Sequence, residues 1–89
     1  MVNKIQIRRS CEERGGTFKD NVGMSCQIDD EELRIFGFDR GNNITVETIG
    51  SQSYTEFNNI DLDDISIHRG KIDIEVDGNK ENDYVRFNF

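Results

Sequence analysis

ISIHRGKIDIEV, residues 65–76, alternates apolar and polar side chains on both sides of a central Arg-Gly pair. If that pair forms the tip of a two-residue hairpin, Ile67 lies opposite Ile72 and Ile65 lies opposite Ile74, all on one face. The period of two residues is that of a strand with one buried face. The stretch therefore predicts an antiparallel hairpin with one apolar face and one polar face.

The sequence YVRFNF, residues 84–89, continues the same alternation after a turn that runs from Gly78 to Asp83. It predicts a third strand beside the hairpin, in a fixed register with the middle strand. The predicted pairs are Val76 with Val85, Ile74 with Phe87 and Ile72 with Phe89. The last third of the chain is thus expected to be a three-stranded meander with an apolar face and an acidic face.

Short alternating segments, separated by Gly, Asn and Asp, fill the rest of the chain. We expect strands at residues 2–9, 24–28, 33–38 and 44–49, and a helical turn near residues 10–15 with Ser10 as its N-cap. Many short strands at close spacing favour a small antiparallel sandwich or barrel. The chain of 89 residues is therefore predicted to be a single domain, 1–89, of all-β class, or α+β if the helical turn forms.

The hairpin formed by residues 33–49 is the basis of a predicted homodimer. Pairing Phe38 with Ile44 and Phe36 with Val46 builds one apolar face, and apolar side chains then remain on the other face as well. A hairpin with apolar groups on both faces is usually central in a packed structure or buried by a partner chain, and the thin core of a domain this small favours the partner chain. The candidate dimer face consists of Leu33, Ile35 and Ile49.

The chain is strongly acidic, with a formal net charge of −7 from 11 Lys and Arg against 18 Asp and Glu. This charge argues against direct binding of nucleic acid, and against binding to an anionic membrane. No apolar run is long enough to cross a bilayer, and residues 1–10 lack the apolar region of a secretory signal. We expect a cytoplasmic protein, or an exported one if Met1 was added to a trimmed chain.

The two cysteines, Cys11 and Cys26, leave two interpretations open. They could form a disulfide across a loop of about 15 residues, which would stabilise the fold by roughly 3 kcal/mol. In a reducing cytoplasm they would instead stay as two buried thiols. The absence of a Cys-x-x-Cys motif argues against a redox-active pair, and the single distant histidine, His68, argues against a zinc site.

The acidic face of the predicted meander is the candidate partner surface. Residues 73–84 follow the spacing of a calcium loop in part, but Tyr84 stands where the loop needs a bidentate Glu. We therefore expect no metal and no cofactor. In the predicted register Asp64 faces Glu75, and Arg86 lies on the other side of Glu75 and offsets part of the repulsion. The candidate partner surface consists of Asp61, Asp63, Asp64, Asp73, Glu75, Asp77 and Tyr84.

The sequence contains no arrangement typical of catalysis. It has one histidine, no Gly-x-Ser-x-Gly motif and no phosphate-binding loop. We therefore expect a non-enzymatic acidic protein that binds a macromolecule with a basic surface. One version is an inhibitor from a mobile element that mimics nucleic acid with its carboxylates. The alternatives are a small module that binds carbohydrate or a loosely held cation, and a structural domain that serves assembly.

One short segment resembles a known family of lectins. Residues 60–65, followed by Gly70 and Ile72, are similar to the Ile-Asp-Leu segment of cyanovirin-type sugar-binding repeats, which also carry a cysteine pair upstream. The Asn and Asp that precede the glycine in that family are Ile67 and Arg69 here, and the chain has no second repeat. We do not assign the chain to that family, and the resemblance bears only on the carbohydrate alternative.

Overall fold

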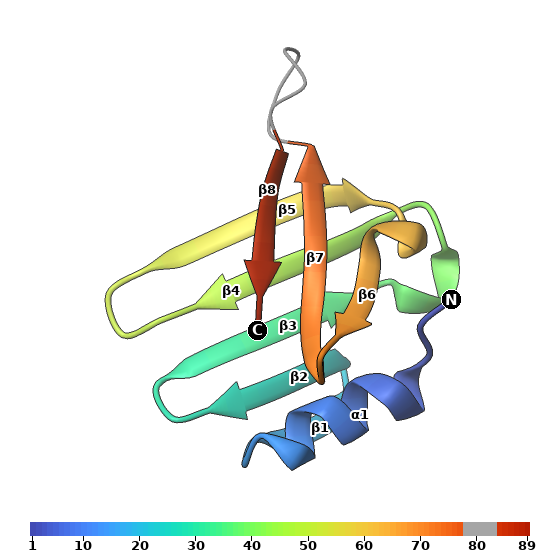
Figure 1. Ribbon diagram of the computed structural model, residues 1–89. Helices are drawn as coiled ribbons and strands as arrows, with labels where there is room; N and C mark the ends of the chain where they lie inside the picture. Colours follow the sequence, from blue (N-terminus) through green and yellow to red (C-terminus); the bar gives the residue numbers. More distant parts are fainter. Residues whose placement is uncertain (78–83) are drawn as a thin grey trace.

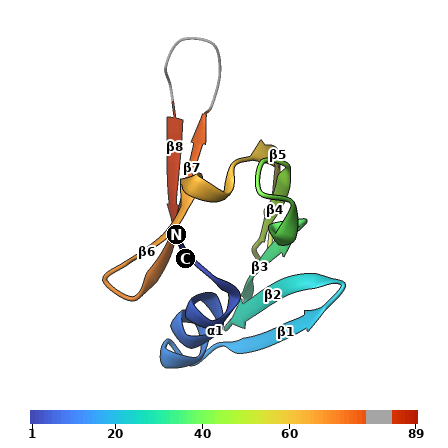
Figure 2. The same cartoon turned by 90° about the vertical axis from the view of Figure 1, so that its right-hand side faces the viewer.

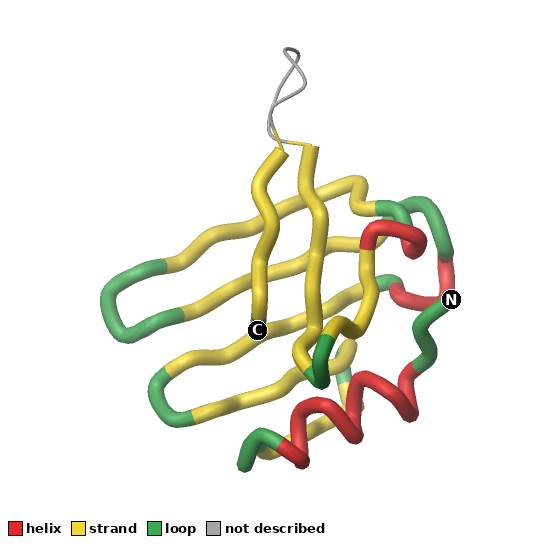
Figure 3. Tube along the Cα trace, viewed as in Figure 1, coloured by secondary structure: helices red, strands yellow, loops and turns green. Residues whose placement is uncertain are grey.

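The computed structural model describes the backbone of residues 1–77 and 84–89, and the side chains of residues 1–76 and 89. In these residues two antiparallel sheets pack against each other, and one α-helix closes the space between them at one end (Figures 1 and 2). This confirms the predicted fold class, with a helix longer than expected. Short 3-10 turns join strands at one side of the molecule (Figure 3).

The larger sheet has the strand order β1-β2-β3-β4-β5, and the smaller sheet has the order β6-β7-β8. The strands of the larger sheet are β1 (Thr17–Asn21), β2 (Gly23–Ile28), β3 (Glu31–Phe36), β4 (Ile44–Ile49) and β5 (Tyr54–Ile60). Those of the smaller sheet are β6 (Ile65–His68), β7 (Lys71–Asp77) and β8 (Tyr84–Asn88). The helix is α1 (Lys4–Glu13), and the 3-10 turns are η1 (Phe38–Arg40) and η2 (Leu62–Asp64).

The core lies between the inner faces of the two sheets and is aliphatic. Because side chains on a strand alternate between its faces, each central strand sends every second residue inward. The buried cluster consists of Ile7 from α1, Met24, Leu33, Ile35, Ile44, Val46 and Ile60 from the larger sheet, and Ile65, Ile72, Ile74 and Val76 from the smaller sheet. The opposite face of the larger sheet is turned away from this core.

The C-terminal meander has the predicted register. Ile65 pairs with Ile74 and Ile67 with Ile72. The two tip residues have φ values of 53° and 77°, which suit a tight turn that matches the twist of the strands. The three predicted pairs between β7 and the C-terminal strand are also confirmed, the last one by backbone hydrogen bonds in both directions between Ile72 and Phe89. The turn from Gly78 to Asp83 lies outside the described residues.

The predicted strand at residues 2–9 is wrong, because this segment belongs to α1. Asn3 is the N-cap: its side chain accepts from the Gln6 N–H, and the Gln6 side chain accepts from the Asn3 N–H. Ser10, the expected N-cap, lies within the helix, and its hydroxyl donates to the Gly70 carbonyl. Ile7 is buried with Cys11 one turn later, whereas Ile5 is 68% exposed, so the helical period decides which side chains enter the core.

The predicted register of the β3–β4 hairpin is wrong by one residue. Ile35 lies opposite Val46, and Phe36 lies opposite Thr45. β3 ends earlier than expected because Gly37 adopts a left-handed conformation, with φ of 75°. A shift of one residue moves every side chain to the other face.

The same shift overturns the candidate dimer face. Leu33 and Ile35 are 1% and 2% exposed and belong to the core, so they are not available to a partner chain. Ile49 lies on the opposite face of the sheet and is half-buried. The basis for a dimer at these three residues is therefore lost.

Cys11 and Cys26 form a disulfide, with the sulfur atoms 2.11 Å apart and the Cα atoms 5.9 Å apart. The bond joins α1 to β2, and both residues are buried. Gly16 follows the helix at a point where a Cβ would come within 2.8 Å of the Cys11 sulfur, so the close approach requires glycine. In the described part of the chain, α1 is the single α-helix, and it is too short and too polar to cross a lipid bilayer.

Candidate protein-binding surface

The outer face of the larger sheet is turned away from the smaller sheet and α1 (Figure 2). Its side chains fall into rows that cross the strands. One row crosses all strands of the sheet in register, and it changes from basic to acidic along its length. It consists of Lys19, Ser25, Arg34, Glu47 and Glu56. The acidic end of this row lies on β4 and β5.

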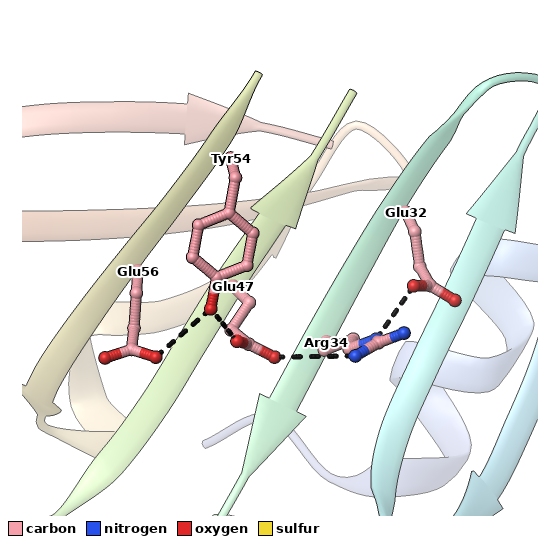
Figure 4. A network of polar contacts seen from close by, with 5 residues as sticks. All are labelled: Glu32, Arg34, Glu47, Tyr54 and Glu56. Carbon is pink, nitrogen blue, oxygen red and sulfur yellow. Dashed lines mark hydrogen bonds and ion pairs between the residues drawn. The ribbon is translucent and has the colours of Figure 1, made fainter. Parts of the chain in front are cut away.

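A network of polar contacts joins this row to its neighbours on the outer face (Figure 4). The Nε of Arg34 donates to Oε1 of Glu32 at 2.7 Å, and its Nη1 lies 3.9 Å from Oε1 of Glu47. The hydroxyl of Tyr54 donates to Glu47 and contacts Oε2 of Glu56 at 3.2 Å. The network therefore contains three carboxylates and one cation, and it carries a net negative charge.

Glu47 and Glu56 lie directly opposite each other on neighbouring strands. Like charges at opposed positions repel, and here Arg34 and the hydroxyl of Tyr54 offset part of that repulsion. Hydrogen bonding to Glu47 raises the pKa of Tyr54 to about 12, and desolvation and the hydrogen bond to Glu56 add to the effect. Tyr54 is 57% exposed, so its ring is accessible beside these carboxylates.

β5 is an edge strand of the larger sheet, and its pairing with β4 determines where its backbone groups point. The Gly50 N–H donates to the Ser53 carbonyl, so these two residues form a hydrogen-bonded pair. Hydrogen-bonded and non-hydrogen-bonded pairs alternate along an antiparallel ladder. The next hydrogen-bonded pair is therefore Thr48 with Thr55, whereas the N–H and C=O groups of Tyr54 and Glu56 point away from β4.

The same two residues thus present their backbone groups at the edge and their side chains on the outer face. We call this feature the open edge, defined by Tyr54 and Glu56 on β5. Nearby, the ladder has an irregularity between Ile44 and Val46, and Asn59 has a φ of 60°. The regular part of the open edge therefore ends before Asn59.

The predicted partner surface on the meander is only partly a surface. Asp73 is 3% exposed and is buried in β7, so the prediction is wrong for this residue. Asp61 is the N-cap of η2, and its side chain accepts from the Asp63 N–H at 3.0 Å. Its carboxylate thus has a structural task in the free protein.

The remaining residues of the predicted partner surface differ in how far they are exposed. Asp63 is exposed, while Asp64 and Glu75 are half-buried. Burial raises the pKa of Asp64, and the carboxylates of Asp61, Glu75 and Asp63 add to the effect. Arg86 lies opposite Glu75 in the backbone register, as predicted. The side chains of Asp77 and Tyr84 lie outside the described residues.

The sequence analysis missed the network around Tyr54. A signal was present in TVETI (residues 45–49) and YTEF (residues 54–57), which alternate in phase across a short polar connection. A two-residue hairpin through that connection aligns Glu47 with Glu56, as the structure does. In the described part of the chain, no three His, Cys, Asp or Glu side chains are grouped so that they could hold a metal ion.

Comparison with models of protein families, with curated protein sequences and with solved structures found no match for this chain.

Proposed function

We propose that this protein is a non-enzymatic binding domain that recognises a basic segment of another protein on the β4–β5 part of its outer face. The single observation that carries the proposal is the opposed pair Glu47 and Glu56, which lies beside the exposed ring of Tyr54. Two adjacent carboxylates repel each other in the free protein, and a cation brought next to them relieves that repulsion.

The chemistry of this part of the outer face suits a lysine or arginine side chain. A carboxylate forms charge-assisted hydrogen bonds with either cation, and the face of an aromatic ring attracts cations within about 6 Å. Tyr54 and Glu56 are both exposed, so a partner reaches them without any rearrangement of the core. The net charge of −7 adds a long-range attraction that speeds the encounter with a basic partner.

Mimicry of nucleic acid by an inhibitor is one form of this function, and competition with duplex DNA for the basic partner distinguishes it. The place of action is part of the proposal as well. Disulfides persist in oxidising compartments and are rare in a reducing cytoplasm. The bond between Cys11 and Cys26 supports a protein that works in an oxidising compartment.

Binding to decalysine tests the proposal, because every side chain of this probe is a lysine. Glu47→Gln with Glu56→Gln should weaken binding about tenfold, because it removes a charge-assisted contact at the exposed Glu56 and the charge of Glu47, whose side chain is only 12% exposed. The control, Glu12→Gln with Glu13→Gln, removes the same charge from exposed positions on α1 and should change the affinity less than twofold.

The salt dependence of decalysine binding provides the second readout. Contacts between exposed charges are screened as ionic strength rises, so the affinity of the wild type should fall steeply between low and physiological salt. Equal weakening by both double variants would show that only net charge matters and would contradict the proposed surface. An affinity that does not change with salt would contradict the proposed chemistry.

A further inference from the structure

The open edge adds a second kind of contact to the acidic surface. Tyr54 and Glu56 direct their backbone N–H and C=O groups away from β4, and the described chain places no strand on that side of β5. An edge of this kind is a template for another extended chain. The usual devices that block an edge are few here, because the regular part of β5 contains no lysine and no proline.

We propose that an extended segment of the partner, with basic side chains at alternate positions, adds to β5 as a further antiparallel strand. This inference rests on the proposed function and names the mode of binding and the chemistry of the partner. Main-chain hydrogen bonds to Tyr54 and Glu56 hold the segment, and its alternate side chains select it.

The register of the sheet determines where the basic side chains lie. A residue opposite Glu56 on the added strand shares the outer face with Glu56, because directly opposed residues project to the same side. The row that crosses the larger sheet then continues from Glu47 through Glu56 to a lysine or arginine of the partner. The next outward residue of β5 is Tyr54, so a second basic side chain lies beside its ring.

Two other edge strands, β1 and β6, are less suited to this role. β1 lies against α1, which the disulfide ties to the neighbouring strand β2 (Figure 1). β6 is a strand of only four residues, and it also contacts α1. β5 has seven residues, and its one neighbour in the larger sheet is β4.

The test mixes the intact protein with the peptide acetyl-(Lys-Thr)4-Lys-amide. Amide hydrogen exchange of the protein is then measured with and without the peptide. In the complex, the N–H groups of Tyr54 and Glu56 should become protected at least about tenfold, because they donate to the added strand. The matching peptide with Glu in place of Lys should give no protection. Protection of these amides with rising protein concentration and no peptide would show that the occupant is a second copy, and would overturn the proposal.

Peptides with N-methylated backbones distinguish strand addition from binding by electrostatic attraction alone. In antiparallel addition the Lys residues opposite Tyr54 and Glu56 direct their N–H groups toward β5, and the Thr N–H groups point away. Methylation of the Lys backbone nitrogens should therefore weaken binding about tenfold or more, while methylation of the Thr nitrogens should change it less than twofold. Equal effects of the two modifications would overturn strand addition.

The outcomes for the two proposals can be told apart. If both methylated peptides bind as well as the parent, and Glu47→Gln with Glu56→Gln still weakens binding, the acidic surface remains and strand addition fails. If neither decalysine nor the Lys-Thr peptide binds, both proposals fail. Glu56→Pro gives an independent check, because it removes one outward N–H group and should weaken the parent Lys-Thr peptide more than it weakens the peptide with methylated Lys nitrogens.

Discussion

The two edges of the larger sheet are protected in different ways. At one edge, β1 is short, lies against α1, and is close to the disulfide that joins this helix to β2. At the other edge, β5 is longer, and in the described residues no element lies along its outer side. Its outward backbone groups belong to Tyr54 and Glu56, whose side chains also take part in the acidic network.

This difference indicates that β5 is the edge of the larger sheet that is more open to another chain. An unpaired edge exposes a protein to unwanted pairing, and proteins block such edges with helices, charges or irregularities. Near the β1 edge, α1 contacts β1 and contributes Ile7 to the core. The β5 edge has only the charge of Glu56 and the irregularity near Asn59, and both leave the regular segment open to an extended partner of opposite charge.

The largest expected effect comes from removing the bond that ties α1 to β2, beside the β1 edge. Cys11→Ala with Cys26→Ala removes a bond that closes a segment of 15 residues. The chain-entropy model predicts a loss of about 3 kcal/mol in the free energy of unfolding. Urea unfolding of the variant and of the wild type measures the difference, with the wild type in dithiothreitol as a control. A change under about 1 kcal/mol in both would contradict the role assigned to the disulfide.

Proline substitutions on β5 should reduce stability more where the N–H group points toward β4 than where it points away from the sheet. Thr55→Pro removes an N–H that bonds to β4 and leaves the Thr48 carbonyl without its partner. Glu56→Pro removes an N–H that points away from the sheet. We expect Thr55→Pro to lower the free energy of unfolding by about 2 kcal/mol more than Glu56→Pro does. Denaturant unfolding of both variants is the measurement, and the reverse order would show that the open edge is assigned to the wrong residues.

Removing one acidic group at each edge should have opposite effects on stability. Glu56→Gln relieves the repulsion with Glu47 and should raise the free energy of unfolding by about 0.5 kcal/mol at low salt. Asp20→Asn, on β1, removes a carboxylate 3.9 Å from the Lys4 ammonium and should lower it by about as much. Both effects should shrink at high salt. Thermal unfolding at two ionic strengths checks them, and effects of the same sign would contradict the comparison.

The pH dependence of stability should report the network at the open edge. The raised pKa of Tyr54, about 12, means that the folded protein keeps this proton more tightly than the unfolded chain does. The contribution to stability is complete below pH 10 and is lost as the pH rises through 12. Relative to Tyr54→Phe, the wild type should therefore lose stability between pH 10 and 12. A constant difference across this range would contradict the hydrogen bonds to Glu47 and Glu56.

Asp64, the last residue of η2, provides the weakest test. The pKa of Asp64 is raised, so in this case the folded state disfavours the charged form. Its contribution to stability is present at low pH and is lost as the pH rises through the folded-state pKa. Asp64→Asn should thus stabilise the protein slightly at pH 7 and have less effect below the normal pKa of aspartate. Thermal unfolding at pH 3 and pH 7 measures this, and equal effects at both would argue against it.

The register between β6 and β7 could be predicted because their connection has little freedom, and that between β7 and β8 because apolar and polar side chains alternate on both strands. The Arg69-Gly70 turn leaves one register for β6 and β7, and that register was predicted correctly. The loop between β3 and β4 is longer, and the left-handed Gly37 ends β3 early, so the pattern alone allowed two registers. In the N-terminal segment, Ile5 and Ile7 fit a strand as well as a helix. The capping box of Asn3 and Gln6 was the signal that favoured a helix.

The candidate site was harder to predict because it depends on pairing between strands. Glu47, Tyr54 and Glu56 meet only because β4 and β5 form a hairpin whose connection looked like a flexible polar linker. The acidic residues of the meander, by contrast, are conspicuous in the sequence. Asp61 nevertheless caps η2, and Asp73 is buried. The number of acidic residues in a segment therefore does not identify the carboxylates that are free to contact a partner.

The central claim is that β5 is an open edge whose outward groups belong to Tyr54 and Glu56. Amide hydrogen exchange of the free protein tests it most directly. The N–H groups of Tyr54 and Glu56 should exchange at nearly the rate of an unfolded chain, while those of Thr55 and Phe57 should be protected by their bonds to β4. Slow exchange at all four positions, or the reverse alternation, would contradict the account.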